Sequence, residues 1–198
     1  MGVKGDQTRR RIVTASLQLF SVKGYFNTGI NDLLTATGLT KGGFYGHFRS
    51  KEELWYAVYD EAVAIWKTHI FANLESMTDP LQRIARVVDN HLFAYLGAEV
   101  FDGGCFFVNM IVELSGQSAG MSRHLFRGLV GYSKLIQSWL AEAEKDGHLK
   151  PGRDYRQVAD FILIALNGAS TLYTASRDPS VLRETGEQLG RYLDGLRP

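Results

Sequence analysis

Apolar residues recur along almost the whole chain at intervals of three and four positions, which places them on one face of an α-helix. We find neither the two-residue alternation of a half-buried strand nor an internal repeat. The pattern therefore predicts an all-α protein. We expect about nine helices, near residues 8–24, 28–38, 40–48, 50–73, 79–97, 105–114, 120–145, 155–176 and 181–196.

Most of these helices follow a residue whose side chain can accept a hydrogen bond from an amide of the first turn. Ser50 and Glu53 have the spacing of a capping box, and Pro80 suits the first turn of a helix. Glycines end several helices. The expected N-caps are Asp6 or Thr8, Thr28, Thr40, Ser50 and Asp79, in chain order for the first five helices.

The eighth helix is apolar on more than one side. Its stretch 158–175 is long enough to suggest a membrane span, but Asp160 and Asn167 would be unfavourable at the centre of a bilayer. We therefore expect a buried helix and no membrane partner. One side of a monomer cannot cover so much apolar surface, so we expect a second copy to cover it, with Leu166 and Leu189 in the interface.

The composition, 45% apolar and 22% charged residues, is that of a globular chain with a sizeable core. A single cysteine excludes an internal disulfide and a multi-cysteine zinc site. Histidines and acidic residues show no metal-ligand spacing, so we expect neither a metal nor a cofactor. The N-terminus lacks a basic and then apolar leader, which predicts a cytoplasmic protein.

The net charge of +1 conceals an uneven distribution. Residues 1–51 carry eight basic and two acidic side chains, a net charge of +6, whereas residues 52–198 carry −5. This asymmetry favours a small polyanion-binding head on a mildly acidic body. A basic face that is merely solvated is the alternative.

The segment 30–45 has the pattern of helix, glycine turn and helix, with Gly38 at the turn. In such a helix-turn-helix the second helix enters the major groove. Thr40 and Lys41 place backbone amides and a cation where a phosphate can bind. Gly42 and Gly43 each destabilise a helix by about 1 kcal/mol relative to alanine, which close approach to a base edge, or simply a structural turn, would explain.

Residues 8–55 resemble the DNA-binding head of the TetR/AcrR family of one-component regulators. The resemblance rests on the spacing of Phe20, Gly24, Tyr25 and Thr28 and on the run 40–54 with its Lys-Gly-x-Phe-Tyr-x-His-Phe-x-Ser-Lys core. It implies a three-helix, homeodomain-like head at residues 1–52 and a six-helix ligand-binding and dimerising body at 53–198. It also implies a dimeric repressor that a small-molecule inducer releases from a pseudo-palindromic operator. Helices eight and nine would pair with their mates as a four-helix bundle.

The resemblance also implies roles for eight residues of the head. Gly43 stands where the family often has threonine, serine or alanine, so its side chain offers no base contact. Of the adjacent rings, Phe44 is the better core candidate, which leaves Tyr45 outside. The implied phosphate contacts are Thr28, Thr40, Tyr45, His47 and Lys51, and the implied base-reading surface is Lys41, Gly42 and Gly43.

Aromatic and sulfur-containing residues accumulate between helices four and eight, which suggests an apolar pocket with a few polar groups. The alternative is that most of them are ordinary core residues. Asn109 and Glu113 share one helical face and need polar partners. The candidate ligand-binding residues are Trp66, His69, Phe93, Cys105, Phe106, Asn109, Met110, Glu113, Phe126 and Trp139.

Cys105 supports an alternative function as a thiol-based sensor of electrophiles or oxidants. It should open the sixth helix, where the helix dipole stabilises a thiolate, although Asp102 as a cap would oppose this. Residues 104–114 resemble a Gly-Cys-x-x-x-Asn-x-x-x-Glu-Leu segment of one family branch that includes regulators of this kind. A buried structural cysteine is the simpler interpretation.

A cysteine-dependent enzyme is the remaining alternative. It would have to combine Cys105 with His91 or His124 and with Glu113. That spacing matches no catalytic signature, so we expect no enzymatic activity.

Overall fold

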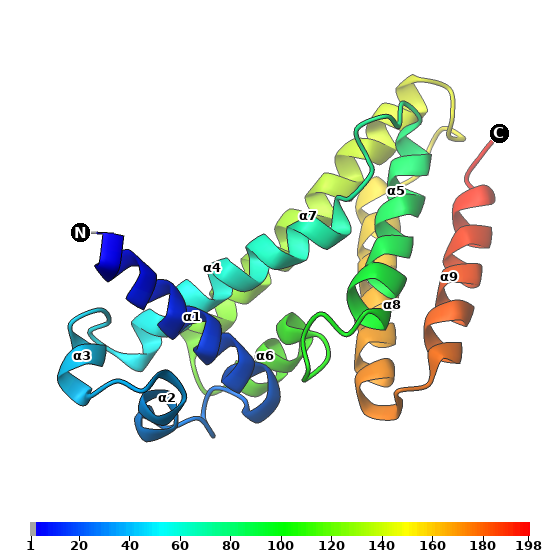
Figure 1. Ribbon diagram of the computed structural model, residues 1–198. Helices are drawn as coiled ribbons and strands as arrows, with labels where there is room; N and C mark the ends of the chain where they lie inside the picture. Colours follow the sequence, from blue (N-terminus) through cyan, green and yellow to red (C-terminus); the bar gives the residue numbers. More distant parts are fainter. Residues whose placement is uncertain (1–2) are drawn as a thin grey trace.

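A computed structural model describes residues 3–198, and in this part of the chain it contains helices and no strands. Figure 1 shows a small N-terminal head, two long helices that lead away from it, and an upright group of helices at the C-terminal end. The predicted all-α fold with a head and a body is confirmed. The elements are α1 Val3–Lys23, α2 Ile30–Thr37, α3 Lys41–Tyr45, α4 Lys51–Ile70, α5 Pro80–Asp89, η1 Asn90–Gly97, α6 Phe106–Leu114, α7 Ala119–Lys145, α8 Tyr155–Ser176 and α9 Pro179–Asp194.

The head is built around a core to which each of its helices contributes. Phe20 of α1, Leu33 of α2 and Phe44 of α3 are fully or almost fully buried there. Gly38 joins α2 to α3 with a φ of 66°, a left-handed conformation that glycine adopts without strain. This turn fixes the angle between the two short helices.

The predicted caps are confirmed for α3, α4 and α5. The Thr40, Ser50 and Asp79 side chains each accept a hydrogen bond from a first-turn amide. The expected starts of the first two helices are wrong. α1 begins at Val3, so Asp6 lies inside its first turn. Gly29 occupies the N-cap of α2.

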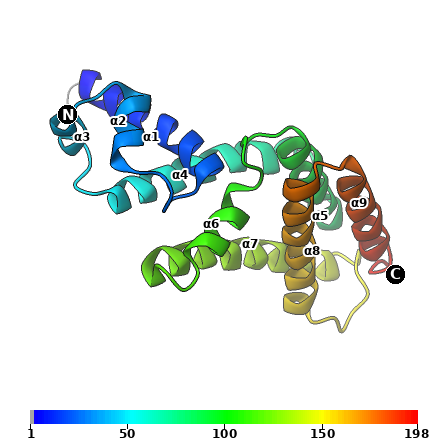
Figure 2. The same ribbon diagram turned by 90° about the horizontal axis from the view of Figure 1, so that it is seen from below.

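α4 connects the head to the body. It crosses residue 52, the predicted domain boundary, without a break. Figures 1 and 2 show α4 and α7 as the long helices of the middle of the molecule, with α6 between the head and α7. One uninterrupted helix therefore belongs to both the head and the body.

The predicted fifth helix consists of two segments. α5 is an ordinary α-helix, but residues 90–97 continue as the π-helix η1. π-helical segments are rare and often lie at functional sites. Here the segment carries His91, a buried residue of the body.

α8 has two apolar faces, as the sequence predicts. It alone among the described helices is long and apolar enough to cross a membrane by length and composition, and 39% of its most apolar window is buried inside the structure. Leu166 faces inward and is fully buried, whereas Phe161, Ile164 and Leu172 are 48%, 69% and 61% exposed. The exposed three define an outer apolar stripe.

The placement of Leu166 and Leu189 at the surface between two copies is wrong. Both side chains are buried inside a single copy, with exposures of 0% and 3%. The reason is helical register: residue 164 lies about 200° around the helix from residue 166. The residues available to a second copy are therefore those of the outer stripe.

Candidate nucleic-acid interface and ligand cavity

The outer face of the helix-turn-helix is open to solvent. Lys41, Gly42 and Tyr45 are exposed, and Tyr45 retains 49% of its surface. Phe44 is fully buried, which confirms the predicted division between these adjacent rings. The Thr40 hydroxyl accepts a hydrogen bond from the Gly43 amide at 3.2 Å. α3 is thus held by a cap at its start and by Phe44 in the core.

His47 lies next to this face and is partly exposed. Its Nδ1 atom is buried and has no hydrogen-bond partner within residues 3–198. The exposed Tyr45 ring thus lies on this face, whereas His47 Nδ1 is enclosed by the head and has no partner among the described residues.

Two of the implied phosphate contacts are engaged inside the head instead. Thr28 is fully buried, and its hydroxyl donates a hydrogen bond to the Gly24 carbonyl at 2.6 Å. The Lys51 ammonium donates to the carbonyls of Tyr25 and Thr28, each at 2.9 Å, and lies 4.2 Å from the centre of the Tyr25 ring. Burial lowers the pKa of Lys51. These contacts, rather than a phosphate, explain a lysine in the first turn of α4.

Glu113, near the end of α6 in the body, binds the turn of the head at Tyr25 and Phe26. Its carboxylate accepts hydrogen bonds from the Tyr25 amide at 2.9 Å and from the Phe26 amide at 2.8 Å. Gly24 makes this approach possible. Its φ is 83°, and a Cβ there would lie 2.7 Å from Glu113 Oε1. We call this contact between Glu113 and the two amides the carboxylate clasp.

The loop before α6 also contacts the head. The Gly103 amide donates to the Ser21 hydroxyl at 3.2 Å, and the Asn109 side chain donates to the Gly103 carbonyl at 2.8 Å. Asn109 and Glu113 thus have protein partners rather than a ligand. Asp102 does not cap α6, because Cys105 occupies the N-cap position.

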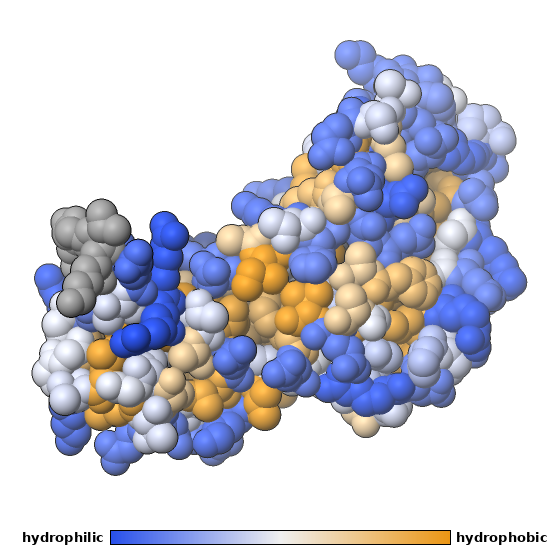
Figure 3. All heavy atoms as spheres, viewed as in Figure 1, coloured by the Kyte–Doolittle hydropathy of each residue, from blue (hydrophilic) through white to orange (hydrophobic). Residues whose placement is uncertain are grey.

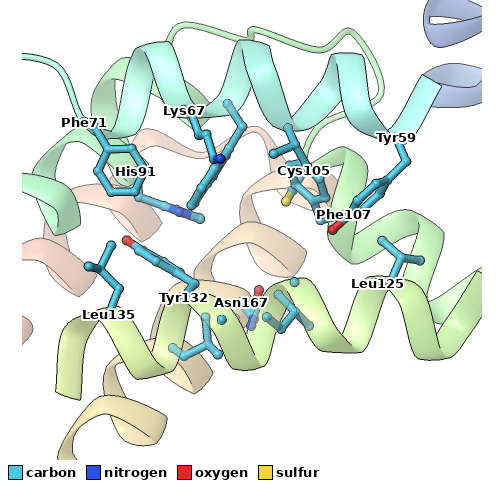
Figure 4. A pocket seen from close by; sticks show the side chains of 16 residues that line it. Tyr59, Lys67, Phe71, His91, Cys105, Phe107, Leu125, Tyr132, Leu135 and Asn167 are labelled. Atoms are coloured by element: carbon cyan, nitrogen blue, oxygen red, sulfur yellow. The ribbon is translucent and has the colours of Figure 1, made fainter. Parts of the chain in front are cut away.

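A cavity of about 470 Å³ lies in the body between α4 and α7. Figure 4 shows its two long walls, with α8 closing one side. Figure 3 shows hydrophobic residues gathered over the middle of this face, between more polar ends. The cavity is lined by Tyr59, Val63, Trp66, Lys67, Phe71, His91, Cys105, Phe107, Leu125, Gly128, Leu129, Gly131, Tyr132, Leu135, Leu163 and Asn167.

Two buried polar atoms in the cavity lining have no protein partner. The Tyr132 hydroxyl and His91 Nδ1 make no hydrogen bond to any described residue, although their side chains are only 7% and 5% exposed. Burial raises the pKa of Tyr132 and lowers that of His91 to about 4. At neutral pH the phenol is therefore protonated and the imidazole uncharged.

Hydrogen bonding favours one of the two neutral forms of His91, which differ in the nitrogen that carries the proton. The Ser170 hydroxyl donates its only proton to the Leu166 carbonyl at 2.8 Å. His91 Nε2 lies 3.1 Å from the same hydroxyl oxygen, which can therefore only accept. With this hydroxyl proton donated to Leu166, the tautomer that satisfies both groups carries its proton on Nε2 and leaves the unpartnered Nδ1 as a hydrogen-bond acceptor.

Cys105 belongs to the floor of the cavity and is 2% exposed. The Tyr95 hydroxyl contacts its sulfur at 3.6 Å. Burial raises the pKa of the Cys105 thiol, and this outweighs the hydrogen bonds from the amides of α6 that lower it. The thiol is protonated at neutral pH, which favours a structural cysteine over a reactive one.

Of the ten candidate ligand-binding residues, the structure brings Trp66 and Cys105 to the cavity. Phe106 and Met110 are buried on the other side of α6 as core residues. Phe93 is 48% exposed near α9, and Phe126 is 60% exposed on α7.

The remaining candidates also lie outside the cavity. Trp139 lines a separate shallow depression with Phe71 and Leu74. His69 follows Lys67 on α4 but is not part of the lining. Asn109 and Glu113 serve the junction with the head, as described above.

Several cavity residues were missed as candidates, although the sequence carries a signal for them. Tyr59, Val63 and Trp66 form a helical stripe on α4. Gly128 and Gly131 lie in the interior of a 27-residue helix, where each glycine is unfavourable. A Cβ at Gly128 would collide with the Tyr59 hydroxyl. Glycines inside a long helix therefore indicate a surface that leaves room for a cavity or for a closely packed neighbour.

The groups that an enzyme would need are not assembled. Glu113 contacts the head, His124 packs against the rings of Tyr56 and Tyr59, and Cys105 lies at the cavity floor. Within residues 3–198, no three His, Cys, Asp or Glu side chains are close enough together to hold a metal ion.

Models of two protein families match the chain. One, described as bacterial regulatory proteins of the tetR family, covers residues 12–58. The other, described as the tetracyclin repressor-like C-terminal domain, covers residues 80–189. The two matches correspond to the head and the body of the structure.

Individual proteins agree with this assignment. The HTH-type transcriptional repressor DhaR of Mycobacterium sp. (strain GP1) is 30% identical over 162 residues, 81% of this chain and 79% of that protein. An HTH-type transcriptional regulator from the lacX 3' region of Lactococcus lactis is 37% identical over 109 residues, 54% of this chain and 55% of that protein. The crystal structure of a TetR transcriptional regulator from Chloroflexus aurantiacus J-10-FL matches with a TM-score of 0.91 and 27% identity, covering 96% of each chain.

The helix-turn-helix head on an all-helical body defines a DNA-binding transcriptional regulator. The chain belongs to the TetR family of bacterial regulators. Members of this family are soluble regulators and not enzymes. They bind DNA operators, typically as dimers that respond to small molecules. The resemblance of residues 8–55 to this family is thereby confirmed.

Proposed function

We propose that this chain is a repressor that binds a pseudo-palindromic operator as a homodimer and releases it when a small molecule enters the cavity. The observation that carries the proposal is the placement of α6. This helix starts beside the cavity at Cys105 and ends at the head with Glu113. A ligand that shifts the start of α6 therefore acts on the element that holds the head.

Six residues of the head are proposed to contact DNA. The exposed Lys41 supplies a cation, and Tyr45 and His47 supply polar groups for phosphate oxygens. Gly42 and Gly43 let the α3 backbone approach the base edges closely. The proposed set is Thr40, Lys41, Gly42, Gly43, Tyr45 and His47. Thr28 and Lys51 are left out of it, because the Thr28 hydroxyl donates its proton within the head and the Lys51 ammonium uses two of its three N–H groups there.

The proposed dimer interface is the outer apolar stripe of α8 together with α9. Phe161 contacts Tyr192 of α9, with ring centres 4.9 Å apart, so the stripe continues onto that helix. Gly168 lies between Ile164 and Leu172 with open space around it, which allows another helix to approach closely. Two heads related by a two-fold axis would meet two half-sites about one DNA turn apart, or a multiple of it.

Repression and location follow from the same proposal. A dimer that covers an operator blocks transcription by occupying the site, and the relative DhaR is named a repressor. The operator lies on the chromosome of a bacterium, so the protein is proposed to act in the cytoplasm.

The test is selection of DNA sites followed by affinity measurements at several salt concentrations. We expect a two-fold symmetric site and a strong fall in affinity with salt. Lys41→Ala should weaken binding and reduce the salt slope by about one. The control is Lys51→Ala, which should lower the melting temperature of the protein but leave the salt slope of its folded form unchanged. Salt-independent binding, or no preferred sequence, would refute the proposal.

A further inference from the structure

The cavity in the body combines an apolar wall with polar groups that have no protein partner. Aromatic rings pack edge to face along it, with Trp66 at 5.0 Å from Tyr132 and 6.1 Å from Phe107 between ring centres. Such walls favour a flat, apolar ligand body. A volume of about 470 Å³ is within the range of pockets for small organic molecules.

The Tyr132 hydroxyl and His91 Nδ1 need opposite kinds of hydrogen-bond partner from a ligand, an acceptor for the first and a donor for the second. Tyr132 is a protonated phenol, so it can donate a hydrogen bond to a ligand oxygen. In the tautomer that the contact of Nε2 with Ser170 favours, His91 Nδ1 carries a lone pair. It therefore needs a donor from the ligand. A buried polar atom left without a partner is unfavourable, so a ligand that satisfies both is selected over a purely apolar one.

Lys67 adds a positive charge to the same space. Lys67 is an exposed residue of α4 that lines the cavity, and Figure 4 shows its side chain on the α4 wall, across from α7. Across residues 3–198 it forms no salt bridge and no hydrogen bond. The residues that line the cavity include no aspartate or glutamate. The positive charge is therefore free to pair with an anionic ligand.

We propose that the cavity binds a hydroxylated aromatic carboxylate. The carboxylate would pair with Lys67 and accept from Tyr132, a ligand hydroxyl would donate to His91 Nδ1, and the ring would pack against Trp66 and Phe107. The inference rests on the proposed function, because it names the chemical class of the molecule that would release the operator.

The test uses three matched probes: 2-naphthylglycolate, its methyl ester, and 2-naphthylacetate. The ester removes the charge, and 2-naphthylacetate removes the hydroxyl. Binding to the full chain is measured by calorimetry and by the shift in melting temperature. We expect 2-naphthylglycolate to bind about tenfold more tightly than its methyl ester and about fivefold more tightly than 2-naphthylacetate.

Three variants assign these differences to residues. In Lys67→Met the glycolate and the ester should bind within twofold of each other, whereas the control Lys134→Met, an exposed lysine of α7 outside the cavity, should keep the tenfold difference. Tyr132→Phe should weaken the glycolate about fivefold. Gly131→Leu should abolish binding of all probes without unfolding the protein, because a Cβ there has open space around it.

The outcomes separate this inference from the proposed function. Equal affinity of the wild type for glycolate and ester, persistence of the difference in Lys67→Met, or no binding of any probe would overturn the ligand class. The operator can still be tested in the absence of probe. Loss of sequence-specific DNA binding in that experiment would overturn the proposed function, while the probe measurements would still decide what the cavity accepts.

Discussion

At the scale of single residues, Cys105 shows how burial changes the chemistry that a sequence position suggests. The start of a helix favours a thiolate, but at 2% exposure the loss of hydration dominates and raises the pKa of the thiol. The reactive form is the thiolate. A thiol sensor needs the thiolate of Cys105, and this buried environment disfavours the thiolate.

We predict that stoichiometric maleimide does not release the wild-type protein from its operator. Labelling of Cys105 in the folded protein should be at least about a hundredfold slower than in urea, because the thiol is buried and protonated. Mass spectrometry measures the rate. Phe126→Cys in a Cys105→Ala background is the exposed control and should label rapidly. Rapid labelling of Cys105 with loss of DNA binding would restore the sensor interpretation.

His91 gives a prediction about pH. Its pKa is about 4 in the folded chain and about 6.5 when unfolded. Between these values the unfolded chain binds a proton that the folded chain does not, so stability is complete above pH 6.5 and is lost as pH falls toward 4. From pH 7 to pH 5 the loss should be about 2 kcal/mol.

Urea unfolding at pH 7 and pH 5 measures this loss. In His91→Gln the same pH change should destabilise the protein by about 2 kcal/mol less than in the wild type. His148→Gln, which changes a histidine outside the cavity lining, should behave as the wild type. Identical pH dependence of the wild type and His91→Gln would show that His91 does not carry the effect.

At the scale of elements, the carboxylate clasp makes α6 a connection between cavity and head. A glutamine at position 113 has a single acceptor oxygen, and its NH₂ group faces donors instead of accepting from them. We predict that Glu113→Gln weakens operator binding about tenfold, because hydrogen bonds to a carboxylate contribute about 1.5–3 kcal/mol. Fluorescence anisotropy with labelled operator measures this.

The same variant tests transmission. The ratio of operator affinities without and with bound ligand should shrink toward one, while ligand affinity in the absence of DNA stays within twofold. Glu75→Gln, an exposed glutamate, is the matched control and should leave both affinities unchanged. An unchanged ratio in Glu113→Gln would mean that the signal travels by another route, such as α4.

How far the sequence predicts these elements depends on the range of the interactions. The Gly38 turn and the Ser50 cap are local, and both are confirmed. The contacts of Lys51 within the head are not predictable in this way because its partners lie 26 and 23 positions earlier in the chain, and Glu113 reaches back 88 positions to Tyr25. Such contacts depend on how helices pack, which helical spacing alone does not specify.

The cavity was predicted only in part for the same reason. The segments that form it are identifiable, but the angle between α4 and α7 decides which of their stripes face each other. Trp66 was found because it is aromatic. Lys67 was not, because a lysine beside an apolar stripe usually lies in solvent. The π-helix of residues 90–97 leaves no recognisable pattern, since its apolar positions also fit an α-helix.

At the scale of the whole molecule, the outer stripe of α8 leaves large apolar side chains uncovered in a single copy. We predict that Ile164→Glu yields a folded monomer with weakened operator binding, because a charge in the proposed interface would be buried without a partner. Sedimentation velocity measures the change of mass, and circular dichroism checks the fold.

Two further variants make this prediction specific. Phe126→Glu, at an exposed apolar position of α7, should remain a dimer. Leu166→Glu should unfold the protein, because Leu166 is fully buried within one copy. A dimeric Ile164→Glu protein would place the contact between copies on another surface.

The π-helix η1 has a consequence for the history of the chain. A π-turn contains one residue more than the α-turn it replaces, so η1 has the form of a single-residue insertion into an older α-helix. Removing one exposed residue there, such as Phe93, would allow α5 to continue as an α-helix and would shift the residues within the widened turn, while those beyond Gly97 would keep their place. Tyr95 lies within this turn and contacts Cys105 beneath the cavity, so a three-nucleotide deletion in the gene would alter the floor of the cavity.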